Sequence, residues 1–332
     1  MQRFLLDLLE CPACHHDLIW RITERRGSQI EAGAARCLAC DATYPIRDGI
    51  GLFLVSETRD DDLWEEAATG LGRFLAEHPD VDAQLTAGPL DALAPADQVF
   101  RALALEERGD PAGAEAAFRA ARPRLYTPDY LACYAAVRQH LIARLAGISQ
   151  PIVDLASGRG DLADELLPAL AGSLVLTDLS PRVLRHDRRR LEARGAYERA
   201  SLLAFDALRT PFKTGALPIL TTNFGLGSVR DASPLLVELR RIVSGSFYAI
   251  TYFFPEDDAA NRAALAAAGL DTLTFRQTAL ERFAAAGWTV TLESVRTGRA
   301  EPTPHGVLIE GAAIDGLPVA STELEWCVLV AR

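Results

Sequence analysis

The stretch "PIVDLASGRGDLADELL", residues 151–167, carries the most information about the fold. An apolar run ends in Asp154, a turn with Gly158 and Gly160 follows, and a helical pattern then begins. A strand, a glycine turn and a helix in this order are typical of a nucleotide-binding unit. Residues 158–163 also fit the dinucleotide fingerprint G-x-G-x-x-G/A, so the stretch alone leaves the choice of nucleotide open.

Length and composition predict a folded, soluble protein. The chain has 332 residues, 49% of them apolar and 24% charged, which is enough for two domains with packed cores. The apolar stretches are too short for a membrane span or a secretory signal, so we expect a cytoplasmic protein without membrane contact. The net charge is −11, and residues 56–150, with nine basic and sixteen acidic side chains, carry most of it. This balance disfavours generic nucleic-acid binding, which depends on neutralising phosphates.

Four of the six cysteines form two C-x-x-C pairs separated by 22 residues. The four are Cys11, Cys14, Cys37 and Cys40. In a cytosolic chain, pairs with this spacing indicate zinc rather than disulfide bonds. Four thiolates complete a tetrahedral site, so we expect a structural Zn²⁺ that takes no part in chemistry. His15 and His16 follow the first pair and are expected to lie beside the site in solvent.

The sequence around the cysteines resembles the small zinc-ribbon protein that activates tRNA, rRNA and release-factor methyltransferases. The features that match are Cys-Pro-x-Cys, Cys-x-x-Cys and the run Tyr44-Pro45-Ile46-Arg47-Asp48-Gly49-Ile50. The resemblance covers residues 1–55 and implies a ribbon that packs against a methyltransferase. In this chain, the ribbon is expected to pack either on its own C-terminal domain or on a partner protein.

Residues 56–126 form an alanine-rich helical accessory segment in this prediction. Asp97 is expected to cap a helix that ends at Gly109, and Asp110 is expected to open the next one. Thr127-Pro128 opens a further helix that runs to Gly147. Neither resemblance described here accounts for the accessory segment, so a lid, a partner surface and a spacer all remain open.

After residue 150, strands and helices alternate, as expected for a doubly wound parallel sheet. The expected strands are 151–155, 173–178, 201–206, 217–223, 246–252, 288–295 and 324–331. The expected helices are 160–167, 181–195, 234–243 and 277–286. Seven strands whose last pair has no helix between them resemble the Rossmann-like α/β sheet of class I methyltransferases, here placed in residues 127–332.

The charges around the glycine turn favour a methyl donor over a dinucleotide. Asp161, Asp164 and Glu165 follow the turn, and Asp154 precedes it. These carboxylates would repel a pyrophosphate, which prefers a helix N-terminus. S-adenosyl-L-methionine carries a sulfonium and an ammonium and no phosphate, so it tolerates them. Arg159 is evidence for a dinucleotide, because it could pair with a phosphate. It could equally pair with the methionine carboxylate or face solvent.

The run "VDLASGRGD" resembles the first motif of class I methyltransferases that use S-adenosylmethionine, an acid and a spacer before Gly-x-Gly-x-Gly. Ala156 replaces the first glycine, which is acceptable only where the backbone torsion φ stays negative. The resemblance implies that Asp178 holds the ribose hydroxyls, and that Asp206 and Ala207 meet the adenine amino group. Any one acid could instead cap a turn, but three strand-end acids share the edge where such sheets bind ligands. The expected cofactor-binding residues are Asp154, Ala156, Ser157, Gly158, Gly160, Asp178, Leu179, Asp206, Ala207 and Asn223.

The methyl acceptor is harder to predict. Methyl transfer from a sulfonium is an in-line displacement in which alignment carries most of the catalysis, and a general base is needed only for a protonated acceptor. Asn223 stands where methylases of amino groups carry Asn-Pro-Pro-Tyr, but the residues after it differ. Tyr252, which closes the fifth strand, and His305, in the long stretch between the last two strands, are the candidate catalytic residues.

Arginines gather on the helix after Asp178. They are Arg182, Arg185, Arg188, Arg189, Arg190 and Arg194. We expect them to form a solvated face, with an RNA-facing patch as the alternative. Three functions therefore remain open: a methyltransferase with a small-molecule acceptor, an RNA (rRNA or tRNA) methyltransferase, and a methyltransferase-fold binding protein without catalysis. The intact acids Asp154, Asp178 and Asp206 argue against the third.

Overall fold

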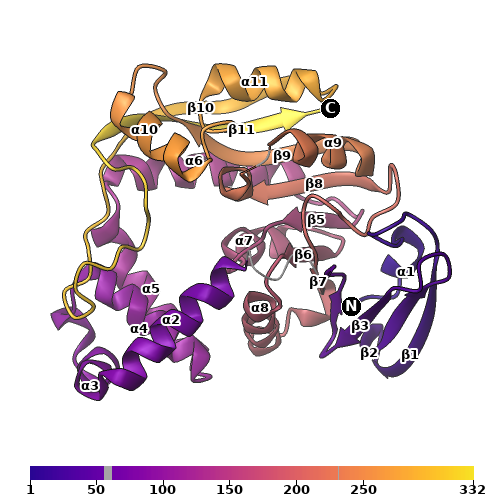
Figure 1. Cartoon of the computed structure of the whole chain (residues 1–332), viewed down its shortest axis with the longest axis horizontal. Coiled ribbons are helices and arrows are strands. Elements are labelled where there is room, and N and C mark those ends of the chain that lie inside the picture. The colour runs from indigo at the N-terminus through magenta and orange to yellow at the C-terminus, as the bar shows by residue number, and fades with distance from the viewer. Residues whose placement is uncertain (56–61, 231) are drawn as a thin grey trace.

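The computed structural model describes residues 1–55, 62–230 and 232–332. Within these residues, eleven strands form one sheet in the order β1-β2-β3-β4-β7-β6-β5-β8-β9-β11-β10 (Figure 1). The strands are β1 (Leu18–Arg26), β2 (Gln29–Cys37), β3 (Thr43–Arg47), β4 (Ile50–Leu52), β5 (Ile152–Leu155), β6 (Leu174–Asp178), β7 (Ala200–Ala204), β8 (Leu217–Asn223), β9 (Val243–Phe253), β10 (Val290–Ala300) and β11 (Thr322–Ala331).

The described helices fall into three groups along the chain. The first group is α1 alone (Leu5–Leu8). The second comprises α2 (Leu63–Glu77), α3 (Pro79–Ala87), α4 (Pro95–Glu107), α5 (Pro111–Leu125) and α6 (Pro128–Leu145). The third comprises α7 (Asp161–Ala169), α8 (Pro181–Ala193), α9 (Ala232–Ile242), α10 (Ala259–Ala268) and α11 (Arg276–Ala285). Three single turns, η2 (Leu90–Ala92), η3 (Tyr197–Arg199) and η4 (Gly225–Ser228), complete the set. The sequence analysis did not predict α10.

The central strands confirm the predicted methyltransferase sheet. Strands β5 to β9 pair in parallel, and β11 lies antiparallel between β9 and β10. Every residue of β5, β6 and β7 is buried, as expected for parallel strands that are covered on both faces. The final pair, β10 and β11, has no helix between its strands, as predicted.

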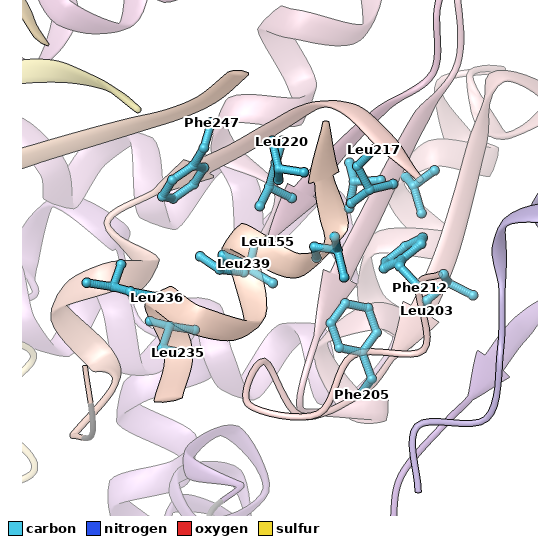
Figure 2. Packing of buried hydrophobic residues seen from close by; sticks show 14 of the residues in the cluster. Leu155, Leu203, Phe205, Phe212, Leu217, Leu220, Leu235, Leu236, Leu239 and Phe247 are labelled. Atoms are coloured by element: carbon cyan, nitrogen blue, oxygen red, sulfur yellow. The ribbon is translucent and has the colours of Figure 1, made fainter. Parts of the chain in front are cut away.

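Two apolar cores lie on the two faces of this sheet. One includes α6, α7 and α8, and the other includes α9 and α11 together with the ribbon. Figure 2 shows leucines of α9 (Leu235, Leu236 and Leu239) close to Leu220 of β8 and Phe247 of β9. These five side chains are fully buried, so α9 is packed into the core against β8 and β9.

The zinc-ribbon segment extends the same sheet. Strand β4 pairs in parallel with β7, from Ile50 against Leu202 to Leu52 against Ala204. The buried Gln29 amide donates to the carbonyl oxygens of Tyr197 and Ala200, at 3.0 and 2.9 Å. The ribbon therefore packs on its own C-terminal domain, one of the two arrangements expected from the sequence.

Helices α2–α5 lie at the end of the molecule away from the ribbon (Figure 1). Asp110 and Thr127 cap α5 and α6 as predicted, through bonds to the amides of Gly113 and Tyr130. The prediction for Asp97 was wrong, because α4 begins at Pro95. The Asp97 carboxylate is instead buried and accepts hydrogen bonds from the backbone amides of residues 307–309, in the loop before β11. No helix among the described residues is long and apolar enough to cross a membrane.

Candidate functional site

Two buried carboxylates lie at the carboxyl edge of the sheet. The Asp178 Oδ2 accepts from the Gly158 amide at 3.0 Å, and its Oδ1 accepts from the Ser180 amide at 3.0 Å. The Asp154 Oδ1 accepts from the Thr221 hydroxyl at 2.8 Å, while its Oδ2 is buried without a hydrogen-bond partner. Burial raises the pKa of Asp154 to about 7 and that of Asp178 to about 6. The glycine turn is thus held over two acids that form no ion pair with the residues the structure describes.

The backbone of the turn departs from the expectation at Ala156. Its φ is +50°, although the alanine was expected to keep φ negative. This left-handed conformation costs an L-residue roughly 1–2 kcal/mol. Gly158 and Gly160 also have positive φ, and a Cβ at Gly160 would lie 2.1 Å from the Arg190 guanidinium. The Ala156 Cβ has room because the residue facing it, Gly225 of η4, has no side chain. A Cβ at Gly225 would lie 2.9 Å from the Ala156 Cβ and 2.3 Å from the Thr222 hydroxyl.

We therefore expect Gly225→Ala to destabilise the protein by roughly 1–3 kcal/mol, because the added methyl group forces apart two packed strand ends. The check is the free energy of unfolding from a urea titration. Gly227→Ala in the same turn is the control, since a Cβ there meets nothing within 4 Å. Equal effects of the two substitutions would contradict the close packing of Ala156 and Gly225.

The other predicted cofactor residues lie around the same edge. The amide and the hydroxyl of Ser157 both donate to the Thr177 carbonyl. Asp206 accepts from the Leu208 amide at 2.9 Å in the turn after β7, and it is half-buried, as are Ala207 and Leu179. Asn223 ends β8 and donates to the Tyr134 hydroxyl at 3.0 Å, and its Oδ1 is buried without a partner.

The helical segment contacts the glycine turn directly. A Cβ at Gly158 would lie 3.6 Å from the Trp64 ring, so α2 begins over the turn. The Arg159 guanidinium pairs with Glu106 of α4 and lies 3.5 Å from the centre of the Phe118 ring of α5. Arg159 is therefore neutralised within the protein, and the evidence it gave for a phosphate ligand is removed.

The arginines of α8 do not form the solvated face that the sequence suggested. Arg182 binds Glu65 and Glu107, at 2.7 and 2.8 Å. Arg182, and after it His186, hold the pKa of Glu107 at about 2. Arg194 pairs with Glu115 of α5 at 3.2 Å, and others bind acids of the ribbon and of α7. Three of the six, Arg185, Arg189 and Arg194, are exposed, and Arg194 is ion-paired. The acidic excess of the helical segment thus faces the basic helix α8.

A cavity of about 1070 Å³ opens beside the glycine turn, between the helical segment and the ends of β8 and β9. Tyr252 lines it, and burial raises the pKa of Tyr252 to about 12. Asn223 and Phe224 line the same wall. His305 does not contribute to this wall, since it is exposed and its Nδ1 lies 3.0 Å from the Gly311 carbonyl oxygen.

Several residues of this cavity were not foreseen from the sequence. Asp315, in the loop before β11, accepts a 2.6 Å hydrogen bond from the Tyr126 hydroxyl, and burial raises its pKa. Arg122 of α5 and Arg138 of α6 place their guanidiniums 5.0 and 4.7 Å from the centre of the Tyr134 ring. No local pattern marks these residues, because they come together only when α5, α6 and the loop pack.

The four cysteines form the predicted metal site. Their Sγ atoms all lie within 4.8 Å of one another, with Cys11 3.6 Å from Cys40 and Cys14 3.4 Å from Cys37. Tetrahedral thiolates at Zn–S distances of about 2.3 Å lie about 3.8 Å apart, so the cluster fits Zn²⁺. His15 and His16 stay outside the cluster and bond to Glu10 and to the Cys14 carbonyl oxygen.

The fold and the two sites define the class: a methyltransferase-fold domain with a zinc ribbon on its N-terminal side. Comparison with known proteins agrees with this. Residues 135–260 match the model of the ubiE/COQ5 methyltransferase family, and residues 2–49 match that of Trm112p-like proteins.

Curated relatives cover part of the chain. It is 32% identical over 107 residues to the ubiquinone/menaquinone biosynthesis C-methyltransferase UbiE of Coxiella burnetii, which covers 31% of this chain and 43% of that protein. The protein of the same name from Acidiphilium cryptum is 29% identical over 103 residues, covering 30% and 41%. The chain thus spans less than half the length of the curated relatives it matches.

Solved structures of low sequence identity also align with it. YcgJ from Bacillus subtilis aligns with a TM-score of 0.47 and 14% identity, over 59% of this chain and 97% of that one. The geranyl diphosphate C-methyltransferase of Streptomyces coelicolor A3(2) aligns with a TM-score of 0.46 and 16% identity, over 60% and 77%.

Proposed function

We propose that the protein is an S-adenosylmethionine-dependent methyltransferase that acts on a small-molecule acceptor, and that its zinc ribbon has a structural role. The observation that carries the proposal is the pair of buried acids, Asp154 and Asp178, under a glycine turn that opens beside a large cavity. The match to a methyltransferase family over residues 135–260 supports it. So do the names of the curated relatives, which are C-methyltransferases of quinone biosynthesis.

The residues at the turn fit a cationic nucleoside ligand. The buried Asp154 Oδ2 lacks a partner, and the hydrogen bonds that Asp178 accepts among the described residues come from backbone amides. Asp178 therefore keeps lone pairs that can accept from two ribose hydroxyls. Asp206 and Ala207 lie beyond the end of β7, where an adenine amino group would reach them in this arrangement. When bound, S-adenosylmethionine supplies an electrophilic methyl group on a sulfonium.

The protein's own contribution to the reaction is alignment. Asn223 and Tyr252, at the ends of β8 and β9, line the cavity beside the turn, where they can orient an acceptor. Desolvation in such a cavity strengthens each polar contact. The Asp315 carboxylate, hydrogen-bonded to Tyr126, is one of the cavity's carboxylates that can take a proton from an acceptor hydroxyl.

The other two functions have less support. An RNA methyltransferase needs free cations on its surface, but four of the six arginines on α8 bind acids of this chain. A binding protein without catalysis would not need two unpaired buried acids at the donor site, since each costs folding energy.

The test is calorimetric titration of the full chain with S-adenosylhomocysteine and, separately, with NADH. We expect the first ligand to bind and the second not to bind. Binding of NADH would overturn the proposal. Binding of neither would favour the non-catalytic alternative and direct the search to protein partners.

We also expect the affinity for S-adenosylhomocysteine to fall as the pH drops below about 6. The Asp178 pKa of about 6 means that the carboxylate takes up a proton there, and a protonated oxygen no longer accepts from a ribose hydroxyl. In the limit, Kd rises about tenfold for each pH unit below that pKa. Titrations between pH 5 and pH 8 test this, and the Asp178→Asn variant should show a much weaker pH dependence.

The stability of the unliganded protein should depend on pH in the opposite direction. The folded-state pKa values of Asp154 and Asp178 lie above their usual value of 3.8, so the folded protein binds more protons than the unfolded chain. Their contribution to stability is fully present below about pH 4 and is lost as the pH rises through 6 to 7. The two opposite trends separate ligand binding from folding.

A further inference from the structure

Two guanidiniums at the cavity have no ion pair among the described residues: Arg189 of α8, which is exposed, and Arg122 of α5, which is half-buried. The neighbours of Arg122 are paired: Arg119 with Glu115 at 2.6 Å, and Arg138 with Glu165 at 2.8 Å. Burying an unpaired charge costs free energy, so its retention at a cavity wall indicates a ligand that compensates it.

The surroundings of Arg122 describe the rest of this ligand. The Arg122 guanidinium lies over the Tyr134 ring, which also contacts Phe224 at a centroid distance of 5.2 Å. Phe224 lies 5.6 Å from the Tyr252 ring on the same wall. An aromatic wall beside one half-buried cation without an ion pair suits a ring or an apolar body that carries one anionic group.

A carboxylate fits this cation better than a phosphate does. One guanidinium offers a planar pair of N–H donors, which matches the two oxygens of a carboxylate. A phosphate monoester carries almost two charges at neutral pH and needs a second free cation. Arg138 cannot serve as that cation without releasing Glu165. Arg189 is exposed on α8, whereas Arg122 and Arg138 are the described arginines that lie over the Tyr134 ring.

We propose that the acceptor is an aromatic or apolar carboxylate, and that Arg122 binds its carboxylate and so determines specificity. This inference rests on the proposed function, because it assigns the cavity to the acceptor. Asn223 ends β8 on the same wall, and its Oδ1, which lacks a partner, can accept from a polar group on the ring. The acceptor would thus be held at both ends, with its reactive atom facing the donor site.

The test compares two probes that share a ring and differ in charge, naphthoate and naphthalenemethanol. Each is titrated calorimetrically into the full chain saturated with S-adenosylhomocysteine. We expect the wild type to prefer naphthoate, and Arg122→Gln to weaken naphthoate binding roughly 10- to 100-fold while leaving naphthalenemethanol within about twofold. Arg122→Lys should keep part of the affinity, because lysine keeps the positive charge but lacks the planar pair of N–H donors.

The matched control is Arg119→Gln, three residues earlier on the same helix, where the guanidinium is paired with Glu115. It should leave both affinities unchanged. Near-equal affinity of the wild type for the two probes, an unchanged naphthoate affinity in Arg122→Gln, or no naphthoate binding at all would overturn the inference. Titration with S-adenosylhomocysteine alone keeps the proposals apart: donor binding without naphthoate binding leaves the proposed function standing and removes only the acceptor class.

Discussion

Cys37→Ser is expected to remove the zinc ion and to destabilise the whole protein, not the ribbon alone. Structural zinc contributes folding free energy directly, with apparent binding free energies of about 10–16 kcal/mol in isolated zinc fingers. Here the ribbon strand β4 pairs with β7 of the methyltransferase-fold domain, and the Gln29 amide holds two carbonyl groups at the start of that strand. Loss of the ribbon therefore exposes an edge of the central sheet.

Zinc content by mass spectrometry and the thermal unfolding midpoint measure the effect. We expect zinc to fall from about one ion per chain to near zero, and the midpoint to fall by on the order of 10 °C. His16→Ala is the control, because His16 lies next to the site without entering it. A Cys37→Ser protein that is as stable as the wild type, with no zinc in either, would refute the four-thiolate site.

The parts of the fold that could be predicted from sequence are those with local signals. The central strands β5, β6 and β7 are short, buried runs, and Asp154 and Asp178 mark where two of them end. The two cysteines of each C-x-x-C pair are only three positions apart in sequence, so their spacing alone predicted the metal cluster. These elements have the predicted boundaries to within a few residues.

The parts that could not be predicted depend on contacts between distant segments. Asp97 looks like a helix cap, but its carboxylate binds backbone amides more than two hundred residues later in the chain. Arg182 looked solvated because its partners, Glu65 and Glu107, belong to a segment that carries no recognisable motif. The left-handed Ala156 depends on Gly225, which the sequence does not place beside it.

The role of the helical segment follows from these same distant contacts. Its acids bind the arginines of α8, its Trp64 lies over Gly158, and its helix α5 supplies Arg122 to the cavity. Of the lid, the partner surface and the spacer considered from sequence, these contacts favour the lid. The segment would then cover the donor site and form part of the acceptor wall.

Asp178→Ala is expected to weaken S-adenosylhomocysteine binding roughly 10- to 150-fold, the equivalent of about 1.5–3 kcal/mol for lost hydrogen bonds to a charged group. The carboxylate is positioned for this role by the amides of Gly158 and Ser180, which fix both its oxygens at the edge of the sheet. Asp161→Ala is the matched control, because Asp161 is an exposed acid on the helix after the same turn.

The Asp178 substitution also removes the acceptor of the Gly158 amide, so a purely structural role must be distinguished from a binding role. A structural role lowers the thermal midpoint of the unliganded protein and leaves the shift produced by saturating ligand intact. A binding role reduces that ligand-induced shift, because stabilisation by a ligand grows with the ratio of its concentration to Kd. An Asp178→Ala protein with undiminished affinity would return Asp178 to the role of a turn cap, and the donor site would have to be sought elsewhere along the sheet edge.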